Sequence, residues 1–291
     1  MITIVSPAKL NLSLLVGPPR TDGYHPLESL VQTIGWCDHL VMGLASQGRD
    51  EVSFEGADLD PEDNLVSRSL IAFRRESGVR GATVPPMGVT VRKDIPMEAG
   101  LGGGSSNAAA TLVGAAALAG LGQEGLAALG LDIGSDVPLF LTGGTLMVSG
   151  VGDVIEQAEP MTGFAFAVVV PEFGLATREV YRRWDELQGP QGEQAGNRGI
   201  PPALRDGMPL RNDLLPAALD LEPRLGDFMA DLRAAWDAPV FLTGSGTACF
   251  GYFADLDEAA SACLSVAHLS KQSRSVPIRP HGVSVAGLHQ E

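Results

Sequence analysis

The residues best suited to chemistry lie in one short segment, IPMEAGLGGGSSN at positions 95–107, which leads into an alanine-rich stretch. Glycine occupies four of the five positions 100–104, so the backbone there can adopt positive φ and approach a ligand without a clash from Cβ. Successive amides in such a loop form a concave anion site, and a following helix adds partial positive charge at its N-terminus. The segment predicts a phosphate-binding loop, with the hydroxyls of Ser105 and Ser106 in reach of phosphate or of phosphate-bound Mg²⁺.

Two common phosphate motifs do not describe this loop. The pattern GxxxxGK[ST] is absent, and GxGxxG fails because the sixth position counted from Gly100 is Ser105. The alternative is a glycine-rich turn that serves only tight packing. Clustered glycines that run directly into SSN favour the phosphate site over that alternative.

An aspartate and a lysine elsewhere in the chain have the residue types that phosphoryl transfer needs. A carboxylate beside a hydroxyl can accept its proton, and a nearby ammonium keeps the carboxylate ionised and offsets charge on the transferred group. Asp136 precedes the dipeptide VP, so it is also a candidate helix N-cap, and the two roles are compatible. The alternative for Lys9 is an ordinary solvated lysine on an edge strand.

The segment KLNLSLLV at 9–16 alternates polar and apolar residues with a period of two, which predicts a strand. One face of this strand carries Leu10, Leu12 and Leu14 and needs a core. The other face carries Lys9, Asn11 and Ser13 and is left for solvent or a ligand.

Turns rather than helices join most of the predicted strands, which favours an α+β fold over a doubly wound one. Further strands are predicted at 29–35, 39–44, 51–55, 88–93, 164–170, 240–243 and 248–253, at the C-terminus, and in a hairpin at 143–156 that turns around 150–153. Helices are predicted at 64–76, 105–121, 213–219, 223–236 and 257–268. Residues 188–209, rich in Gly, Pro and Gln, are predicted to form a mobile loop.

Composition limits the possible partners. The chain has 291 residues, enough for two domains, and 20 Lys and Arg against 35 Asp and Glu give a net charge of −15. That charge argues against nucleic acid or an anionic membrane as partner, although it permits a phosphorylated small molecule. The 3 cysteines fit neither a disulfide framework nor a zinc site. Because no signal peptide or membrane-spanning stretch is evident, we expect a soluble cytoplasmic protein.

Three segments in this order, PAKLNL at 7–12, the glycine loop and LTGSGTA at 242–248, resemble the GHMP kinases. This is the family of galactose, homoserine, mevalonate and phosphomevalonate kinases. Further segments resemble the branch of the family whose substrate carries a cytidine diphosphate: RTDGYH at 20–25, PEDNL at 61–65, GSDVP at 134–138, GVG at 150–152 and RNDL at 211–214. DGYH is the most specific of them. The resemblance spans nearly the whole chain and is thinnest at 188–209.

The resemblance implies a fold of two α+β domains, an ATP-binding domain at 1–154 and a substrate domain at 155–291, with catalysis in the cleft between them. It implies an ATP- and Mg²⁺-dependent kinase that phosphorylates the 2-hydroxyl of a methylerythritol bearing a cytidine diphosphate, in the non-mevalonate pathway of isoprenoid biosynthesis. A GHMP kinase for another small alcohol and a non-catalytic nucleotide-binding protein are the alternatives. Monomer and homodimer both stay open.

Residue by residue, the resemblance implies that Asp136 is the catalytic base and Lys9 its partner. On the nucleotide side it implies Pro96, Met97, Glu98, Ala99, Gly100, Leu101, Gly102, Gly103, Gly104, Ser105, Ser106, Asn64, Leu65 and Lys93. On the substrate side it implies Asn11, Tyr24, His25, Tyr181, Thr243, Gly244 and Ser245. No dedicated metal site is implied, because Mg²⁺ would arrive with ATP, with Ser106 as a candidate contact.

Three of these residues, and Asp94 next to Lys93, have an alternative interpretation or depart from the family pattern. Asn64 is also a candidate N-cap, and Tyr181 is also a candidate for an ordinary packed helix residue. The family usually has a small residue at position 98, so we expect the Glu98 side chain to point away from the phosphates or to contact the metal. Asp94 stands where a basic or neutral residue is common.

Overall fold

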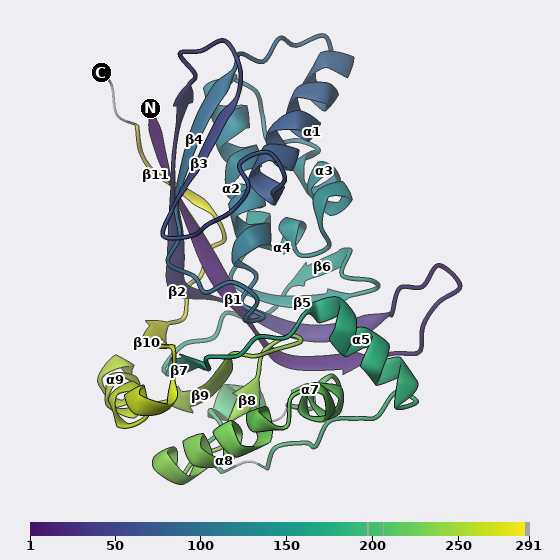
Figure 1. The fold of residues 1–291 in the computed structure, drawn as a ribbon, viewed down its shortest axis with the longest axis vertical. Coiled ribbons are helices and arrows are strands. Elements are labelled where there is room, and N and C mark those ends of the chain that lie inside the picture. Colours follow the sequence, from purple (N-terminus) through teal and green to yellow (C-terminus); the bar gives the residue numbers. More distant parts are fainter. Residues whose placement is uncertain (197, 206, 289–291) are drawn as a thin grey trace.

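The structure is a computed structural model that describes residues 1–196, 198–205 and 207–288, and it confirms the α+β class. Figure 1 shows two parts stacked along the long axis of the molecule. The upper part is a seven-stranded sheet with helices on one face, and the lower part is a four-stranded sheet with its own helices.

The larger sheet has the strand order β11-β1-β2-β4-β3, and β5 and β6 extend it from β2. Its strands are β1 (Ile2–Val16), β2 (Leu27–Leu44), β3 (Glu51–Glu55), β4 (Met87–Arg92), β5 (Thr145–Ser149), β6 (Val154–Gln157) and β11 (Ser284–Leu288). The two strands predicted at 29–35 and 39–44 are one strand, β2, because residues 35–36 form an irregularity in the ladder with β1 instead of a turn. The hairpin predicted at 143–156 is confirmed as β5 and β6.

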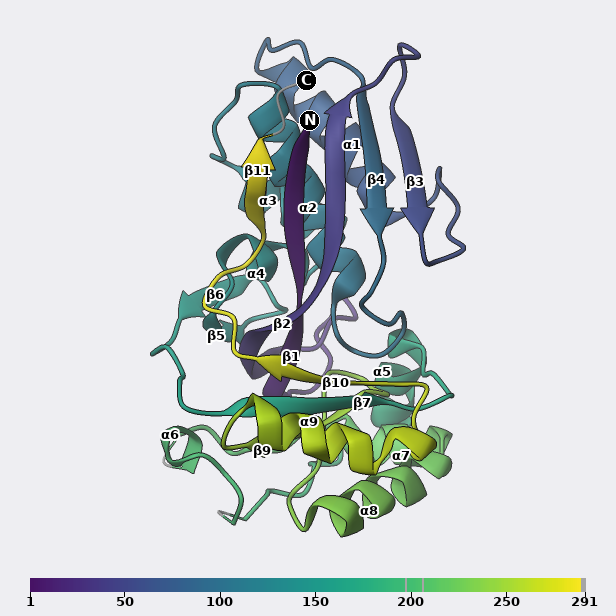
Figure 2. The ribbon, with the colours of Figure 1, turned by 90° about the vertical axis from the view of Figure 1, so that its left-hand side faces the viewer.

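Helices cover one face of this sheet, while Figure 2 shows its other face with the helices behind. They are α1 (Leu65–Val79), α2 (Gly103–Leu118), α3 (Leu126–Ile133) and α4 (Val137–Thr142). Small residues let the alanine-rich α2 lie close to β1 and β2: a Cβ on Gly114 would stand only 2.3 Å from Sδ of Met42. The sequence did not predict α3, and it indicated α4 only through the candidate N-cap Asp136.

The smaller sheet has the order β10-β7-β9-β8. Its strands are β7 (Ala165–Val170), β8 (Phe241–Leu242), β9 (Cys249–Phe253) and β10 (Gln272–Pro277). The surrounding helices are α5 (Thr177–Glu186), α6 (Pro202–Arg205), α7 (Leu215–Leu221), α8 (Arg224–Trp236), α9 (Leu256–Ser265) and the short 3₁₀ helix Ala267–Leu269. The single strand predicted at the C-terminus is two strands, and the second, β11, returns to pair with β1. The domain boundary expected at 154/155 stays a prediction.

The segment predicted as a mobile loop at 188–209 contains the short helix α6 and the buried side chains of Ile200 and Leu204. Residues 197 and 206 of that segment lie outside the described residues. Its mobility stays a prediction.

Strand β1 runs through both parts of the molecule and carries residues of the predicted site. A bulge at Leu12, where the pairing with β2 shifts between Asn11 and Ser13, changes the alternation of its side chains. Leu10 and Leu12 consequently belong to one apolar cluster and Leu14 to another. The prediction that Leu14 shares a face with the other two leucines is therefore wrong.

The cysteines and the helices bear on two further expectations from composition. Cys37, Cys249 and Cys263 are free thiols, and burial raises the pKa of Cys249 to about 12 and that of Cys263 to about 11. Within the described ranges, no helix is both long enough and apolar enough to cross a membrane.

Candidate active site

A cavity of about 620 Å³ is lined by residues from both parts of the molecule. Most residues that the sequence singled out lie on its wall: Lys9, Asn11, Asn64, Leu65, Lys93, Pro96, Met97, Glu98, Ala99, Gly100, Leu101, Gly102, Gly103, Gly104, Ser105, Asp136, Tyr181, Gly244 and Ser245. The residues that do not line it are Tyr24, His25, Ser106 and Thr243. Segments far apart in the sequence thus meet at one place.

The glycine loop needs its glycines for two reasons. Gly100 and Gly102 have φ values of 76° and 72°, in the left-handed region that favours glycine. A Cβ on Gly100 would also lie 2.3 Å from the carbonyl oxygen of Thr243. The loop is thereby in direct contact with the second glycine-rich turn, and the amide of Ala248 donates to the carbonyl oxygen of Ala99 at 3.1 Å.

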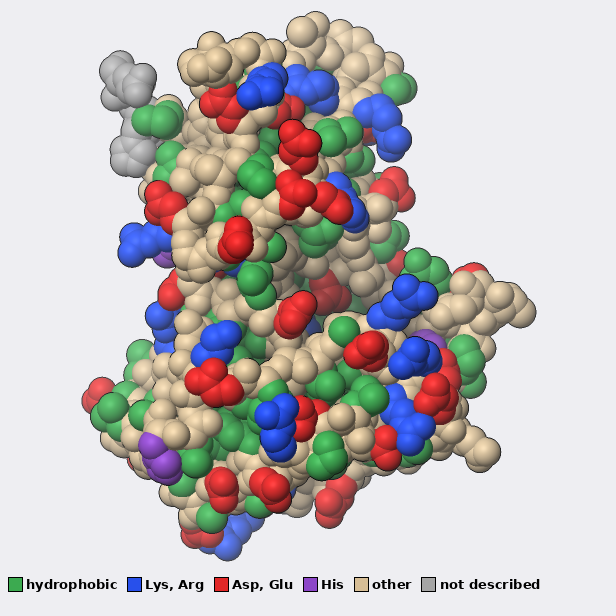
Figure 3. Space-filling view, in the orientation of Figure 1, with side chains coloured by type: hydrophobic (Ala, Val, Ile, Leu, Met, Phe, Trp, Pro, Cys, Tyr) green, Lys and Arg blue, Asp and Glu red, His purple; other side chains and the backbone are tan. Residues whose placement is uncertain are grey.

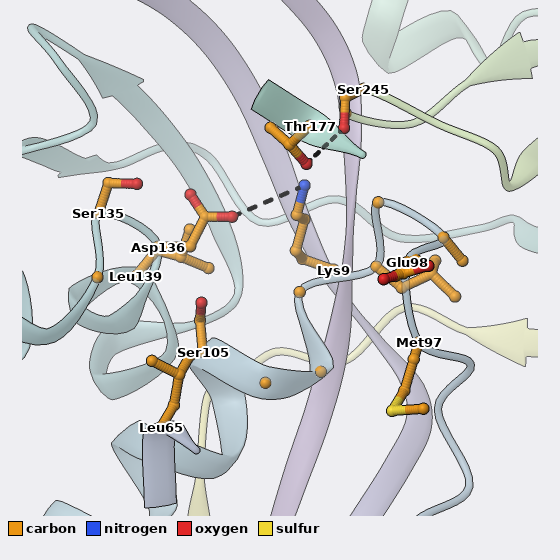
Figure 4. A pocket seen from close by; sticks show the side chains of 18 of the residues that line it. Lys9, Leu65, Met97, Glu98, Ser105, Ser135, Asp136, Leu139, Thr177 and Ser245 are labelled. Atoms are coloured by element: carbon orange, nitrogen blue, oxygen red, sulfur yellow. Dashed lines mark hydrogen bonds and ion pairs between the residues drawn. The ribbon is translucent and has the colours of Figure 1, made fainter. Parts of the chain in front are cut away.

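The two serines after the glycines have different environments. Ser105 lines the cavity, and its hydroxyl points toward the space beside Asp136 in Figure 4. Ser106 is fully buried, and its Oγ lies 2.7 Å from Oγ of Ser6. The hydroxyl available to a ligand in the cavity is that of Ser105.

Lys9 and Asp136 form the charged centre of the cavity, joined by a dashed line in Figure 4. Nζ of Lys9 lies 3.9 Å from Oδ2 of Asp136, and the same ammonium donates to Oδ1 of Asn11. Burial lowers the pKa of Lys9, while the charge of Asp136 acts in the opposite direction. Asp136 is the N-cap of α4 by position, but its side chain makes no capping hydrogen bond, so its carboxylate is free to face the cavity.

Aromatic side chains gather beside the cavity, where the segment between β1 and β2 meets helix α5. Nε2 of His25 lies 2.8 Å from Oδ1 of Asp185, and its ring centroid is 5.2 Å from that of Tyr181 and 5.4 Å from that of Trp184. Burial, followed by the charge of Asp136, raises the pKa of Tyr181 to about 12. Tyr24 is 64% exposed and lies outside the cavity wall.

The turn at 242–248 is held from several sides. Oγ1 of Thr243, a buried residue, accepts from the amide of Asn11 at 2.9 Å. Oγ of Ser245 lies 2.8 Å from Oγ1 of Thr177, at the start of α5 (Figure 4). The buried side chain of Asn212 donates to the carbonyl oxygen of Gly244 at 2.7 Å. These contacts fix the turn opposite the glycine loop.

Thr177 is on the cavity wall, and sequence reasoning gave neither it nor Asn212 a role. The segment RNDL did single out Asn212 as part of a matching motif, but nothing in that pattern indicated the Gly244 contact. The apolar wall of the cavity was also missed, because isolated apolar residues carry no signal of their own: Leu14, Leu27, Val31, Phe54, Leu59, Val66, Leu139, Val148, Val151 and Leu214.

The side chain of Asn64 caps a helix as well as lining the cavity. Its Oδ1 accepts from the amide of Ser67 at 2.9 Å, and its Nδ2 donates to the carbonyl oxygen of Asp60 at 2.7 Å. The N-cap expected from the sequence is confirmed. The Asn64 side chain thus caps α1 from the wall of the cavity.

The two acidic residues that depart from the family pattern, Asp94 and Glu98, both have neighbours within the protein. Asp94 forms an ion pair with Arg274, whose guanidinium lies 4.9 Å from the centroid of the Trp36 ring. Glu98 has a φ of 55°, and its Oε2 would lie 3.6 Å from a Cβ on Gly174. In Figure 4, Glu98 and Asp136 stand on opposite sides of Lys9.

The chain as a whole is acidic, so an anionic ligand needs local positive charge in the cavity. Figure 3 shows acidic side chains on both the upper and the lower part of the visible face. Lys9 and Lys93 line the cavity, but Lys93 is paired with the buried Asp38. A polyanion in this cavity would therefore depend on backbone amides, the N-terminus of α2 and Lys9.

Comparisons with known proteins agree with this geometry. Residues 64–144 match the model of the GHMP kinases N terminal domain. The chain is 35% identical over 268 residues to the 4-diphosphocytidyl-2-C-methyl-D-erythritol kinase of Pelotomaculum thermopropionicum, covering 89% of this chain and 91% of the relative. It is 36% identical over 276 residues to the kinase of the same name from Sinorhizobium medicae, covering 91% and 90%.

Solved structures agree as well. A crystal structure of 4-(cytidine 5'-diphospho)-2C-methyl-D-erythritol kinase matches with a TM-score of 0.76 and 30% identity, covering 94% of this chain and 99% of that one. Homoserine kinase from Cytophaga hutchinsonii matches with a TM-score of 0.69 at 16% identity, covering 98% and 96%, which shows a common fold alone. The α+β GHMP kinase fold implied by the sequence resemblance is confirmed.

Proposed function

Because the chain belongs to the 4-diphosphocytidyl-2-C-methyl-D-erythritol kinases of the GHMP kinase family, we propose that it transfers the γ-phosphoryl group of ATP to the 2-hydroxyl of 4-diphosphocytidyl-2-C-methyl-D-erythritol. This is an alcohol-phosphorylating step of the non-mevalonate pathway of isoprenoid biosynthesis, carried out in the cytoplasm. The observation that carries the proposal is that Lys9 and Asp136 lie in the same cavity as a glycine loop that begins a helix.

Asp136 acts on the nucleophile. Its carboxylate accepts the proton of the 2-hydroxyl as the hydroxyl oxygen bonds to the γ-phosphorus, and the bond from that phosphorus to the β,γ-bridging oxygen breaks, so that ADP leaves. The exposure of this carboxylate to the cavity and the absence of a capping bond support the role.

Lys9 stabilises the negative charges of the reacting groups. Its buried ammonium, held by Asn11 and beside Asp136, keeps the carboxylate ionised and offsets negative charge on the phosphoryl group in the transition state. Because Lys9 is fixed by packing, little reorganisation is needed when the substrates bind.

The nucleotide occupies the side of the cavity formed by the glycine loop. Amides of the loop and the first turn of α2 bind the phosphates, and the apolar wall near Leu65 and Met97 takes the base. In this proposal residues 1–154 supply most of the ATP site. Glu98 lies beside Gly174, and it stands on the side of Lys9 away from Asp136 (Figure 4).

The donors in the cavity suit Mg²⁺ that arrives on the phosphates. Among the described residues, no group of three or more His, Cys, Asp or Glu side chains is arranged to hold a metal. Mg²⁺ commonly binds through one or two protein oxygens together with substrate phosphates, and the Ser105 hydroxyl is such a donor. Bound there, the metal would neutralise charge on the phosphates.

The substrate occupies the side toward residues 155–291. Tyr181 and His25 offer ring faces for the cytosine, and Tyr24 is placed on the adjacent exposed turn. Asn11, Gly244 and Ser245 line the same cavity as Tyr181 and Asp136. They are proposed to contact the rest of the substrate, with Thr243 supporting Asn11 from within.

Transfer of label from γ-labelled ATP, followed across a set of alcohols, tests the proposal. We expect label on the cytidyl substrate and much less on mevalonate, phosphomevalonate, homoserine or galactose. Label on another alcohol alone would replace the proposed substrate with that alcohol. ATP binding without transfer to any of them would point to a non-catalytic nucleotide-binding protein.

A further inference from the structure

Asp38 is a fully buried carboxylate on β2, outside every motif identified in the sequence. Its Oδ1 accepts from the amides of Asp94 at 2.7 Å and Ile95 at 2.8 Å. Its Oδ2 accepts from the ammonium of Lys93. One carboxylate therefore holds three successive residues at the start of the phosphate loop.

The other end of the same loop is held by the residue opposite Asp38. Ser6 on β1 pairs with Asp38 in the β1–β2 ladder, so the two side chains lie on the same face of the sheet. Oγ of Ser6 is within hydrogen-bonding distance of Oγ of Ser106 at 2.7 Å and of Oδ1 of Asn107 at 2.8 Å. Ser6 and Asp38 are both fully buried, so this cross-strand pair fixes the start and the end of the loop.

Asp38 also controls the position of a charge. Nζ of Lys93 would lie 3.2 Å from a Cβ on Gly103, the first residue of α2. A cation at a helix N-terminus opposes the helix dipole, so Lys93 needs a compensating anion to stay there. Asp38 supplies that anion from beneath the loop, which leaves the cavity side open to a phosphate.

We propose that Asp38, with Ser6 as its cross-strand partner, is a positioning residue for nucleotide binding. It fixes the phosphate loop at its start and holds Lys93 at the N-terminus of α2. Because Asp38 does not line the cavity, it acts through these groups without touching the nucleotide. The inference rests on the proposed function for the identity of the ligand, ATP.

The test separates nucleotide binding from catalysis. In Asp38→Asn we expect the KM for ATP to rise about tenfold, the scale of one lost charge-assisted hydrogen bond. We expect kcat at saturating ATP and the KM for the alcohol to stay within about twofold, the pattern for loss of uniform binding. Ser6→Ala should raise the KM for ATP in the same direction by a smaller factor.

Asp213→Asn is the matched control. Asp213 is also buried, and it likewise accepts from two amides, those of Val16 and Gly192, and from a cation, Arg211. If Asp38 were merely structural, both variants would lower the melting temperature and neither would change the KM for ATP selectively. An unchanged KM for ATP in Asp38→Asn, or an equal rise in the control, would overturn the inference.

Two further measurements keep the test decisive. If Asp38→Asn does not fold because Lys93 is left buried and unpaired, Asp38→Asn combined with Lys93→Met removes both charges. Its KM for ATP should exceed that of Lys93→Met alone, and equal values would overturn the role of Asp38. Equilibrium binding of a non-hydrolysable ATP analogue to each variant is measured alongside. If the unaltered chain binds the analogue but transfers no phosphate, the proposed function fails, while the comparison of affinities still decides the role of Asp38.

Discussion

Lys9 and Asp136 lie 3.9 Å apart but differ in exposure, with 6% of the lysine side chain and 42% of the aspartate side chain accessible. The ammonium is fixed within the protein, where it donates a hydrogen bond to Oδ1 of Asn11. The carboxylate is open to the cavity. This asymmetry suits a pair in which the carboxylate contacts a ligand and the ammonium keeps that carboxylate ionised.

Asp136→Asn should lower kcat by about 10²–10⁴ while the chain still folds, because an amide cannot accept the hydroxyl proton. The side chain makes no capping hydrogen bond to α4, so circular dichroism and the melting temperature should change little. Asp132→Asn, an exposed aspartate on the neighbouring helix α3, is the control and should retain its turnover. Equal turnover of Asp136→Asn and the unaltered chain would remove Asp136 as the base.

The lowered pKa of Lys9 predicts an alkaline loss of activity. Burial favours the neutral amine, so kcat/KM should fall as pH rises at values below the ordinary lysine pKa of about 10.4. Stability should move the other way in that window. The unfolded chain, with the higher pKa, binds more protons there, so the contribution of Lys9 to the free energy of unfolding increases with pH.

Pairing a pH–rate profile with thermal denaturation over the same pH range checks both trends. Because the charge of Asp136 raises the pKa of Lys9, the alkaline limb of the residual activity in Asp136→Asn should move to lower pH. If activity were lost at the same alkaline pH in both proteins, that loss would be due to a titrating group other than Lys9.

Gly100→Ala should disrupt the contact between the two glycine-rich segments. The new Cβ would stand 2.3 Å from the carbonyl oxygen of Thr243, and the φ of 76° is unfavourable for alanine. We expect a loss of roughly 1–3 kcal/mol in the free energy of unfolding. We also expect a raised KM for both substrates, because each is proposed to bind one of these segments.

Gly104→Ala is the comparison for stability. A Cβ there would meet only Cδ1 of Leu65, at an ordinary distance of 3.5 Å, and this glycine lies inside α2 without a positive φ. Chemical denaturation should show no loss of stability, since alanine is the better helix former. Equal destabilisation by both substitutions would mean that the Thr243 contact is not the cause.

How much of the structure could be predicted depends on whether the signal is local. The glycine loop, the N-cap Asn64 and the 145–157 hairpin follow from short-range patterns and were located correctly. The bulge at Leu12 was missed, because it depends on the pairing of β1 with β2 and leaves no mark on the alternation in the sequence. That bulge is what separates Leu14 from Leu10 and Leu12.

Parts of the candidate site were missed for the same reason. Asp38 and Ser6 are distant from the phosphate loop in sequence, and only the β1–β2 register brings them beneath its two ends. Lys93 was expected as a cation for ATP, but a sequence cannot reveal that a buried partner balances its charge. Motifs identify residues by type, whereas their electrostatic state depends on residues that carry no motif.

The two serines that follow the glycines should respond differently to removal of their hydroxyls. Ser105 faces the cavity, so Ser105→Ala should raise the Mg²⁺ concentration needed for half-maximal activity and lower kcat/KM for ATP, by about tenfold if one metal or phosphate contact is lost. Ser106→Ala removes a buried bond to Ser6 and should cost about 1 kcal/mol of stability, with the Mg²⁺ requirement unchanged at saturating ATP. Activity titrated with Mg²⁺ at fixed ATP, together with chemical denaturation, distinguishes the two. A shifted Mg²⁺ requirement in Ser106→Ala alone would contradict the orientation of the loop described above.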